Sequence, residues 1–474
     1  MGHGPADARP LRSGWPPGDE KGWRVMGRRT AWWRAGVRRG RPSARVRVAA
    51  AAAVLYTVAI PASWSAEAAP AAAAPRASAP SAASYAFAAG AQKVDGATGT
   101  TDAPRLQVGK TYRSSLSKGA KVYYSFDLGA DSNTYVSATA VPGKGAKLSV
   151  TDGIRVSVQN ADSNSCSYQS ASFGAARSPH PVTAWGARTA SPANPVCKGA
   201  GTYYVVVERV GMADSSPGPW DLELTAVSEP PVNKAGSTSA PKVWDSASPT
   251  PVTGAPKASQ GGAGYSRATA VGQGVWRADI SPGQTLFYKV PVDWGRQLSA
   301  TAELGTASGG GHGYAVDALD LTLYNPVRAH VEDTSVGYDG QQQSVSLAPV
   351  PPVAYANRYA VGDQLSGMRF AGSYYLVLHL SKGVADEFGH GPFGLTLRVR
   401  LGGTAQDGPG YAGQSVPRNV FEVTDEDREN AAAGGAAGGN AAMTAVAVGG
   451  IGAGTVVLAV LGVWTVTARR RAGA

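Results

Sequence analysis

Five short sequence patterns recur in the same order in two blocks of this 474-residue chain, about residues 84–228 and 265–401. The matched segments are 119–126 with 283–290, 136–140 with 298–302, 148–156 with 319–323, 201–207 with 372–378, and 220–224 with 393–399. Five matches in unchanged order predict two copies of one domain. We expect each copy to bury a core of its own.

The matched segments alternate apolar and polar residues and are rich in Val, Tyr, Thr and Leu. Gly, Pro and Asp separate them, and such period-2 runs of β-forming residues are typical of half-buried strands. No helical pattern of comparable length occurs outside the two apolar segments near the chain ends. The expected fold class is mostly β, with two antiparallel, jelly-roll-like β-sandwiches and one C-terminal transmembrane helix.

The order of these strands resembles the bacterial pre-peptidase C-terminal domain, a jelly-roll-like β-sandwich appended to many secreted peptidases. The resemblance rests on G-x-x-x-Y-x-F/V, L-x-L and G-x-Y-Y-V-x-V patterns and covers both blocks. It departs from the family at two long insertions, about 159–200 and 326–371, and in having no peptidase domain before either copy. The resemblance implies an accessory module for binding, solubility or localisation, and it implies no catalysis. The Ala-, Gly-, Arg- and Pro-rich composition fits a GC-rich, actinobacterial-type genome.

A secretory signal peptide with an N-terminal extension is expected in residues 1–68. Eight arginines in residues 28–47 precede the apolar run 48–60, and small residues follow it, which is the order of a signal peptide cleaved after Ala66 or Ala68. An uncleaved signal anchor is the alternative interpretation, and Met26 is an alternative start of translation.

A single transmembrane helix is expected at residues 443–466, a stretch of 24 residues without a charge. About 20 apolar residues are enough to cross a bilayer core. Arg469, Arg470 and Arg471 follow directly, and the positive-inside rule places them in the cytoplasm. We therefore expect a single-pass type I protein of the cell membrane, with residues 467–474 as its cytoplasmic tail and its ectodomain outside the cell.

Three segments have the composition of linkers. Residues 69–83 are rich in Ala, Pro and Ser, and residues 229–264 are rich in Pro, Gly and Ser. Residues 402–442 combine an acidic cluster with a Gly/Ala tract and are expected to form a stalk without a buried core. The central linker is expected to be a solvated tether, so that the two blocks fold independently.

The formal net charge of +11 lies at the two ends of the chain. Residues 1–47 contain 12 Arg or Lys and 3 acidic residues, and three more arginines lie near the C-terminus at 469–471. A nucleic-acid-binding protein needs its cations on a folded face. Nucleic acid is therefore not an expected partner.

Cys166 and Cys197 are the only cysteines, and an even count in an exported chain predicts a disulfide. No other site residue is predicted, whether catalytic, cofactor-binding or metal-binding, and no cofactor is expected. His180 is too isolated to form a metal site, His379 is interpreted as a strand histidine, and His312 lies in a Gly-rich loop. No HExxH, GxSxG or P-loop pattern occurs.

Two further patterns have an ordinary structural interpretation. Acidic residues near turns offer oxygen ligands for calcium but lack a specific spacing, so calcium binding stays open; they are Asp127, Asp131, Asp152, Asp162, Asp317 and Asp320. The tyrosine pairs at 123–124, 203–204 and 374–375 offer a glycan-stacking surface. Adjacent strand residues face opposite sides, so core packing by one tyrosine of each pair is the favoured interpretation.

These patterns favour a non-enzymatic cell-surface binding or accessory protein whose partner is an unknown protein or envelope polymer. The alternatives are an extracellular hydrolase with its site in the domain insertions, and a structural component of the envelope.

Overall fold

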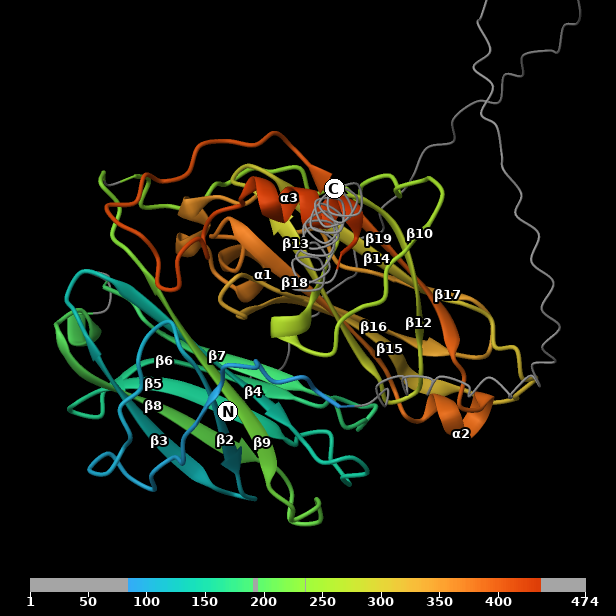
Figure 1. The fold of residues 1–474 in the computed structure, drawn as a ribbon, viewed down its shortest axis with the longest axis horizontal. Coiled ribbons are helices and arrows are strands. Elements are labelled where there is room, and N and C mark those ends of the chain that lie inside the picture. The colour runs from blue at the N-terminus through green and yellow to red at the C-terminus, as the bar shows by residue number, and fades with distance from the viewer. Residues whose placement is uncertain (1–83, 191–194, 235, 436–474) are drawn as a thin grey trace, which may run out of the picture. The chain divides into compact units, whose positions relative to one another are not determined.

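The computed structural model describes residues 84–190, 195–234 and 236–435, and within them the chain is mostly β-structure (Figure 1). The expected signal peptide, the 69–83 linker, the 443–466 span and the 467–474 tail lie outside the described residues. In the part that the structure describes, no helix has the length and apolar character needed to cross a bilayer.

The first block forms two facing sheets, β1-β2-β9-β4-β7 and β3-β8-β5-β6. Their elements are β1 Gln92–Lys93, β2 Thr111–Leu116, β3 Lys121–Leu128, β4 Asn133–Val141, β5 Gly153–Asn160, β6 Ser165–Ser172, β7 Val182–Arg188, the 3-10 helix η1 Pro195–Cys197, β8 Gly201–Val210 and β9 Trp220–Glu229. Apart from the parallel pair β1–β2, neighbouring strands are antiparallel.

The second block forms the sheets β10-β12-β19-β14-β17 and β11-β13-β18-β15-β16. Its elements are β10 Lys257–Ala258, η2 Tyr265–Arg267, β11 Thr269–Ala270, β12 Gly274–Ile280, β13 Thr285–Val292, β14 Gln297–Leu304, β15 Ala315–Tyr324, β16 His330–Tyr338, β17 Gln343–Ser346, η3 Tyr355–Tyr359, α1 Asp363–Ser366, β18 Gly372–Leu380, α2 Val384–Phe388 and β19 Phe393–Gly402. A last helix, α3 Asp425–Ala433, follows the sandwich.

The two sandwiches share one strand order, which confirms the sequence repeat. The eight main strands of each copy, taken in chain order, form one sheet 1-8-3-6 and a second sheet 2-7-4-5, the arrangement of a jelly roll. The match extends to small features, since the antiparallel bridge Ala97–Tyr123 has its counterpart in Gly262–Phe287. The second copy therefore begins near β10, earlier than the expected boundary at 265.

The segments interpreted as insertions are strands of the sandwiches. Residues 159–200 contain β6 and β7, and residues 326–371 contain β16 and β17, one edge strand for each sheet. These edge strands were not recognised from the sequence, although they occupy equivalent places in the two sandwiches. The two sandwiches thus have the same order of strands along the chain, even where their sequence patterns differ.

Alternation along the strands builds the cores. In β14, Leu298, Ala300, Ala302 and Leu304 are buried while the residues between them are partly exposed. Trp220 anchors the core of the first sandwich, and Trp276 belongs to the core of the second. The two cores are separate clusters, as expected for two copies of one domain.

The segment after β19 is packed against both sandwiches, so the expectation of a stalk is wrong for residues 403–435. The backbone of Val416 pairs with that of Ser228, and Phe421 is 2% exposed. Helix α3 begins at a capping box formed by Thr424 and Asp427. Composition failed here because a few well-placed aromatic residues are enough to dock a segment that is polar on average.

The central linker is also bound at its two ends. Val232 bridges to Tyr411 in the C-terminal segment, and Lys257 and Ala258 form β10. Most residues between these points are exposed. The tether is thus much shorter than the sequence suggested, and all described residues fall in one compact unit of the chain.

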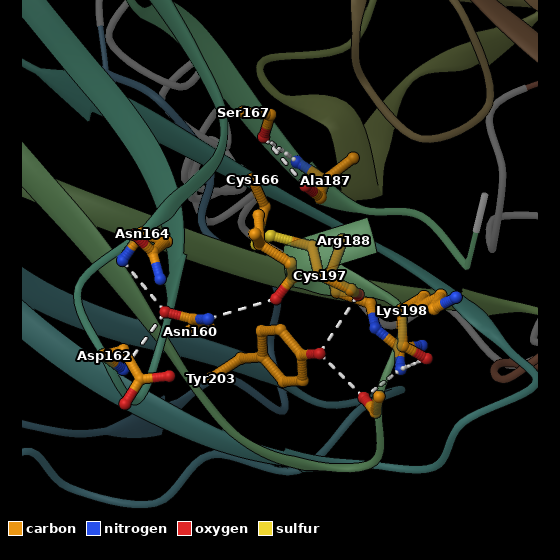
Figure 2. Close-up of a disulfide and its surroundings, with 12 residues drawn as sticks. Asn160, Asp162, Asn164, Cys166, Ser167, Ala187, Arg188, Cys197, Lys198 and Tyr203 are labelled. Atoms are coloured by element: carbon orange, nitrogen blue, oxygen red, sulfur yellow. Dashed lines mark hydrogen bonds between the residues drawn. A yellow bond between two sulfur atoms is a disulfide. The ribbon is translucent and has the colours of Figure 1, made fainter. Parts of the chain in front are cut away.

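The predicted disulfide is present and joins edge strand β6 to the loop before β8 (Figure 2). The Cα atoms of Cys166 and Cys197 are 5.6 Å apart. The Tyr203 hydroxyl donates to the backbone oxygen of Cys197 at 3.0 Å, and the Arg188 guanidinium donates to that of Lys198 at 3.2 Å. The bridge and these bonds hold the irregular loop onto the sheet.

Candidate functional site

The outer face of strand β9 carries acidic residues into the boundary between the two sandwiches. Leu222, Leu224 and Ala226 point into the core of the first sandwich, so Glu223 and Glu229 lie on the opposite face. Both glutamates are nonetheless 0% exposed, because the second sandwich covers them. A buried carboxylate needs charged or hydrogen-bonding partners. We call this boundary the seam.

At one end of the seam, Glu223 pairs with Arg328 of the second sandwich. The Arg328 Nη1 atom donates to Glu223 Oε1 at 2.7 Å, and the Tyr85 hydroxyl donates to the same oxygen at 2.9 Å. The Ala88 backbone N–H donates to Oε2 at 2.9 Å. Burial works to lower the pKa of Arg328, but Tyr85 and Glu223 raise it, and the net shift is upward. The N-terminal segment therefore completes an interdomain ion pair.

At the other end, Glu229 accepts hydrogen bonds from four different side chains. Arg358 Nη2 donates to Oε1 at 2.6 Å, and Tyr411 donates to the same atom at 3.0 Å. Asn133 and Tyr135 each donate to Oε2 at 2.8 Å. Burial works to raise the pKa of Glu229, but Arg358 and these hydrogen bonds lower it below its usual value. The carboxylate is therefore charged and fully satisfied at neutral pH.

An apolar cluster lies beside the Glu229 ion pair. Tyr135 of the first sandwich meets Phe370 of the second edge to face, at a centroid distance of 5.2 Å. Phe421 of the C-terminal segment stacks on Phe370 at 4.6 Å. Such aromatic contacts add to the gain from burial. The seam is thus a hydrophobic and ionic interface to which both ends of the described chain contribute.

A stacked histidine pair crosses the seam. The rings of His180 and His379 lie 4.4 Å apart, and His379 Nε2 lies 2.8 Å from the Ser178 hydroxyl. His180 Nδ1 lies 2.8 Å from the Ser178 carbonyl oxygen, so Nδ1 carries the proton. Burial lowers the pKa of His180 to about 4, and burial with the neighbouring His180 lowers that of His379 further below its usual value. Both imidazoles are therefore neutral at pH 7.

The Ser178–His379 contact does not have the surroundings of a hydrolase triad. Ser178 is 0% exposed, and its hydroxyl oxygen also accepts the Lys382 backbone N–H at 3.0 Å. His379 Nδ1 faces the Thr285 hydroxyl and the Gln284 carbonyl, where a triad would place a carboxylate. Among its described hydrogen bonds, His379 has no acidic partner, and the contact is an interdomain bridge.

A cavity of about 710 Å³ opens beside the histidine pair. Loops of the first sandwich bring Val141 and Pro142 from the end of β4 and Pro179 to Pro181 from before β7. The second sandwich brings residues 260–263 and the start of β13, and residues 84–86 close one side. This volume lies within the usual range for small-molecule sites.

The charged groups lining the cavity are basic. Lys382 and Lys144 are among its lining residues, and no Asp or Glu of the described chain is. His180 also lines it and is neutral, because burial lowers its pKa to about 4. The cavity therefore combines apolar walls with basic side chains.

The tyrosine pairs follow the core-packing interpretation. Tyr124, Tyr203 and Tyr374 are buried at 0%, 4% and 0% exposure, while their neighbours in sequence lie on the outer faces. Tyr375 packs edge to face on Tyr265 at 5.0 Å, within the covered outer face of its sheet.

The acidic residues considered for calcium have separate roles. Asp127 pairs with Arg105 at 2.8 Å, and Asp152 accepts hydrogen bonds from Ser149. In the described ranges, no group of three or more His, Cys, Asp or Glu side chains is arranged to hold a metal ion. Burial and the neighbouring Asp317 and Asp333 raise the pKa of Asp320 to about 7.

Sequence reasoning missed the seam residues. Glu223 occupies a polar position of the alternating strand 220–224, Glu229 begins the segment interpreted as a linker, and Arg328 and Arg358 lie in segments interpreted as insertions. The available signal was weak, since two glutamates six residues apart on one strand face share a side of the sheet. Nothing in the local pattern says that a second domain covers that side.

Comparisons with known proteins establish no family. No protein-family model matches the chain, and no curated protein matches it. The resemblance to the pre-peptidase C-terminal domain therefore stays a prediction, while the β-sandwich fold is observed.

Three solved structures illustrate the weak overall similarity that was found. The CUB1-EGF-CUB2 domain of human MASP-1/3 has 9% identity over 61% of this chain and 99% of its own, with a TM-score of 0.15. The CBM22 tandem of Paenibacillus barcinonensis Xyn10C has 9% identity over 61% and 85%, with a TM-score of 0.17. The ANX1 ectodomain from Arabidopsis thaliana has 10% identity over 64% and 92%, with a TM-score of 0.17. Scores this low carry no argument about function.

Proposed function

We propose that this chain is a non-enzymatic binding protein of the cell surface that holds a ligand in the seam cavity. Residues 443–466 anchor it in the membrane, and the two sandwiches lie outside the cell. The export signal, the apolar C-terminal stretch and the disulfide support this location, since disulfides persist in oxidising compartments.

The observation that carries the proposal is the cavity of about 710 Å³ between two sandwiches that are held together by buried ion pairs. A site between two domains is a common place for a ligand, and rigid walls lower the entropic cost of binding. Glu223–Arg328 and Glu229–Arg358 supply that rigidity, and the aromatic cluster around Phe370 adds to it.

A photo-crosslinking amino acid placed in the cavity tests the proposal. Ala263 lines the cavity and is exposed, so p-benzoylphenylalanine at this position reaches a bound ligand without removing a contact of the walls. Ala247 in the central linker is also exposed and serves as the matched control. Intact cells that produce the full chain are irradiated, and adducts are identified by mass spectrometry.

We expect a defined adduct from position 263 and none from position 247. Equal labelling at both positions, or none at 263, would contradict a ligand site in the seam. An adduct converted to a hydrolysis product would favour the alternative of an extracellular hydrolase. A chain that gives no adduct but whose loss alters cell-wall integrity would favour a structural envelope component.

A further inference from the structure

We infer that the ligand of the seam cavity is a small amphipathic anion, with an apolar body and one carboxylate, sulfonate or phosphate group. This inference rests on the proposed function and adds the chemistry of the ligand to it.

The walls of the cavity select an apolar body. Val141, Pro142, Pro179, Leu286 and Phe287 line it, and they come from both sandwiches. Leu286 and Phe287 are each 1% exposed and already packed against the protein, whereas Val141 and Pro179 are only partly buried and offer apolar surface to the cavity. Apolar walls gain free energy from each apolar surface that leaves water. A ligand without an apolar part would leave this surface unused.

The charges at the cavity select an anionic group. Lys382 lies at the end of β18, where its backbone N–H is held by the Ser178 hydroxyl at 3.0 Å, so the residue stays at the seam. Lys144 reaches the cavity from the other sandwich. No acidic side chain of the described chain lines the cavity, so no carboxylate in its walls opposes an anion. A cleft lined by side chains of one charge attracts ligands of the opposite charge.

The histidine in the wall adds no charge and leaves an acceptor. His180 Nδ1 donates to the Ser178 carbonyl, so Nε2 carries a lone pair. Burial lowers the pKa of His180 to about 4, and the ring therefore does not supply a cation at neutral pH. Recognition of the anion depends on Lys382 and the electrostatic potential around it. The volume of about 710 Å³ sets the size at that of a small molecule and excludes a folded partner.

Three probes with one apolar body separate the contributions of charge and apolar surface. The probes are 6-phenylhexanoate, 6-phenylhexan-1-ol and 6-phenylhexylamine, which differ only in their end group. The full chain is placed in lipid nanodiscs, and binding is measured by titration calorimetry with empty nanodiscs as the blank. We expect the carboxylate to bind about fivefold more tightly than the alcohol, the ratio typical of a partly exposed charge pair, and the amine to bind most weakly.

Variants locate the site and the charge. Lys382→Gln should remove the preference for the carboxylate over the alcohol, and Lys382→Arg should keep it. Lys110→Gln, at an exposed lysine outside the cavity, should change nothing. Ala263→Trp should weaken all three probes by filling the cavity, and Ala247→Trp should not. Unchanged melting temperatures show that these variants are folded.

The outcomes distinguish the ligand class from the proposed function. Equal affinity for the three probes, or a carboxylate preference that persists in Lys382→Gln, overturns the anionic ligand. A specific crosslink from position 263 together with either result leaves the binding function intact. Carboxylate binding that Ala263→Trp leaves unchanged places the anion elsewhere and also overturns the inference.

Discussion

Acid should loosen the seam, because two neutral histidines stack there, His379 buried and His180 partly buried. Both have pKa values lowered chiefly by burial, to about 4 for His180 and well below the usual value for His379. An unfolded histidine titrates near pH 6.5. Below that pH the unfolded state binds more protons than the folded state, so stability falls as the pH drops from 6.5 towards 4. Between pH 7.5 and 5, His180 alone costs about 2 kcal/mol by this linkage, and His379 acts in the same direction.

Asp320 opposes this loss. Burial and then Asp317 and Asp333 raise its pKa to about 7, well above that of an unfolded aspartate. The folded state therefore takes up a proton between pH 7.5 and 5 that the unfolded state does not bind, which stabilises the fold by about 2.5 kcal/mol. Asp320→Asn should therefore lose about 2.5 kcal/mol more stability between pH 7.5 and 5 than the wild-type chain does.

Urea unfolding of the full chain at pH 7.5, 6 and 5 measures this difference. Intrinsic tryptophan fluorescence follows unfolding, and one of its reporters is Trp185, which lies in the seam with the Arg369 guanidinium 5.4 Å from its ring. His312→Asn, at an exposed loop histidine, is the control and should follow the wild type. The reasoning is refuted if Asp320→Asn loses no more stability between pH 7.5 and 5 than the wild type does, or if acid stabilises that variant.

Four further predictions concern the seam and the loop of the first sandwich. Replacing Cys166 and Cys197 with Ala should lower the unfolding free energy by about 3.7 kcal/mol on the chain-entropy model, and non-reducing peptide mapping should link the two cysteines in the wild type. Arg358→Met should destabilise the chain by about 3–5 kcal/mol in urea unfolding, since it leaves Glu229 buried without its cation; Lys110→Met is the control. Phe421→Ala should cost about 3–5 kcal/mol in the same assay, although a true stalk residue would cost nothing. Fragments 84–229 and 257–402, which keep all strands of each sandwich, should melt at lower temperatures than the joined chain, because each exposes its half of the seam; additive melts would restore the tether model.

The repeat and the fold class follow from the sequence because strand patterning is local. Alternation in β14 and β18 marks which residues face the core, and that pattern survives divergence since a core accepts many apolar residues of similar volume. The disulfide was also predictable, because an exported chain with only two cysteines can form only one intramolecular disulfide. The edge strands β6, β7, β16 and β17 escaped detection because their sequences do not repeat between the two blocks; β7 is also buried along nearly its whole length and so lacks the alternation of a half-buried strand.

The C-terminal segment shows the limit of composition. Residues 403–435 are polar and Gly-rich on average, yet Phe421 is buried and α3 is capped by Thr424. A window average cannot register a single aromatic side chain that fits a gap left by two other domains. Whether such a residue is buried depends on a surface that forms only after both sandwiches have folded.

Strand β9 shows which features follow from the sequence and which depend on the tertiary structure. Its sequence by itself determines that Leu222 and Leu224 share one face and that Glu223 and Glu229 share the other. Only the tertiary structure decides that the second face is also buried, because the arginines that neutralise it arrive from more than a hundred residues away. The period of the sequence pattern shows which face of a strand each residue occupies. Whether a charged residue on that face can be buried depends on its partners, and partners that are distant in sequence leave no local pattern.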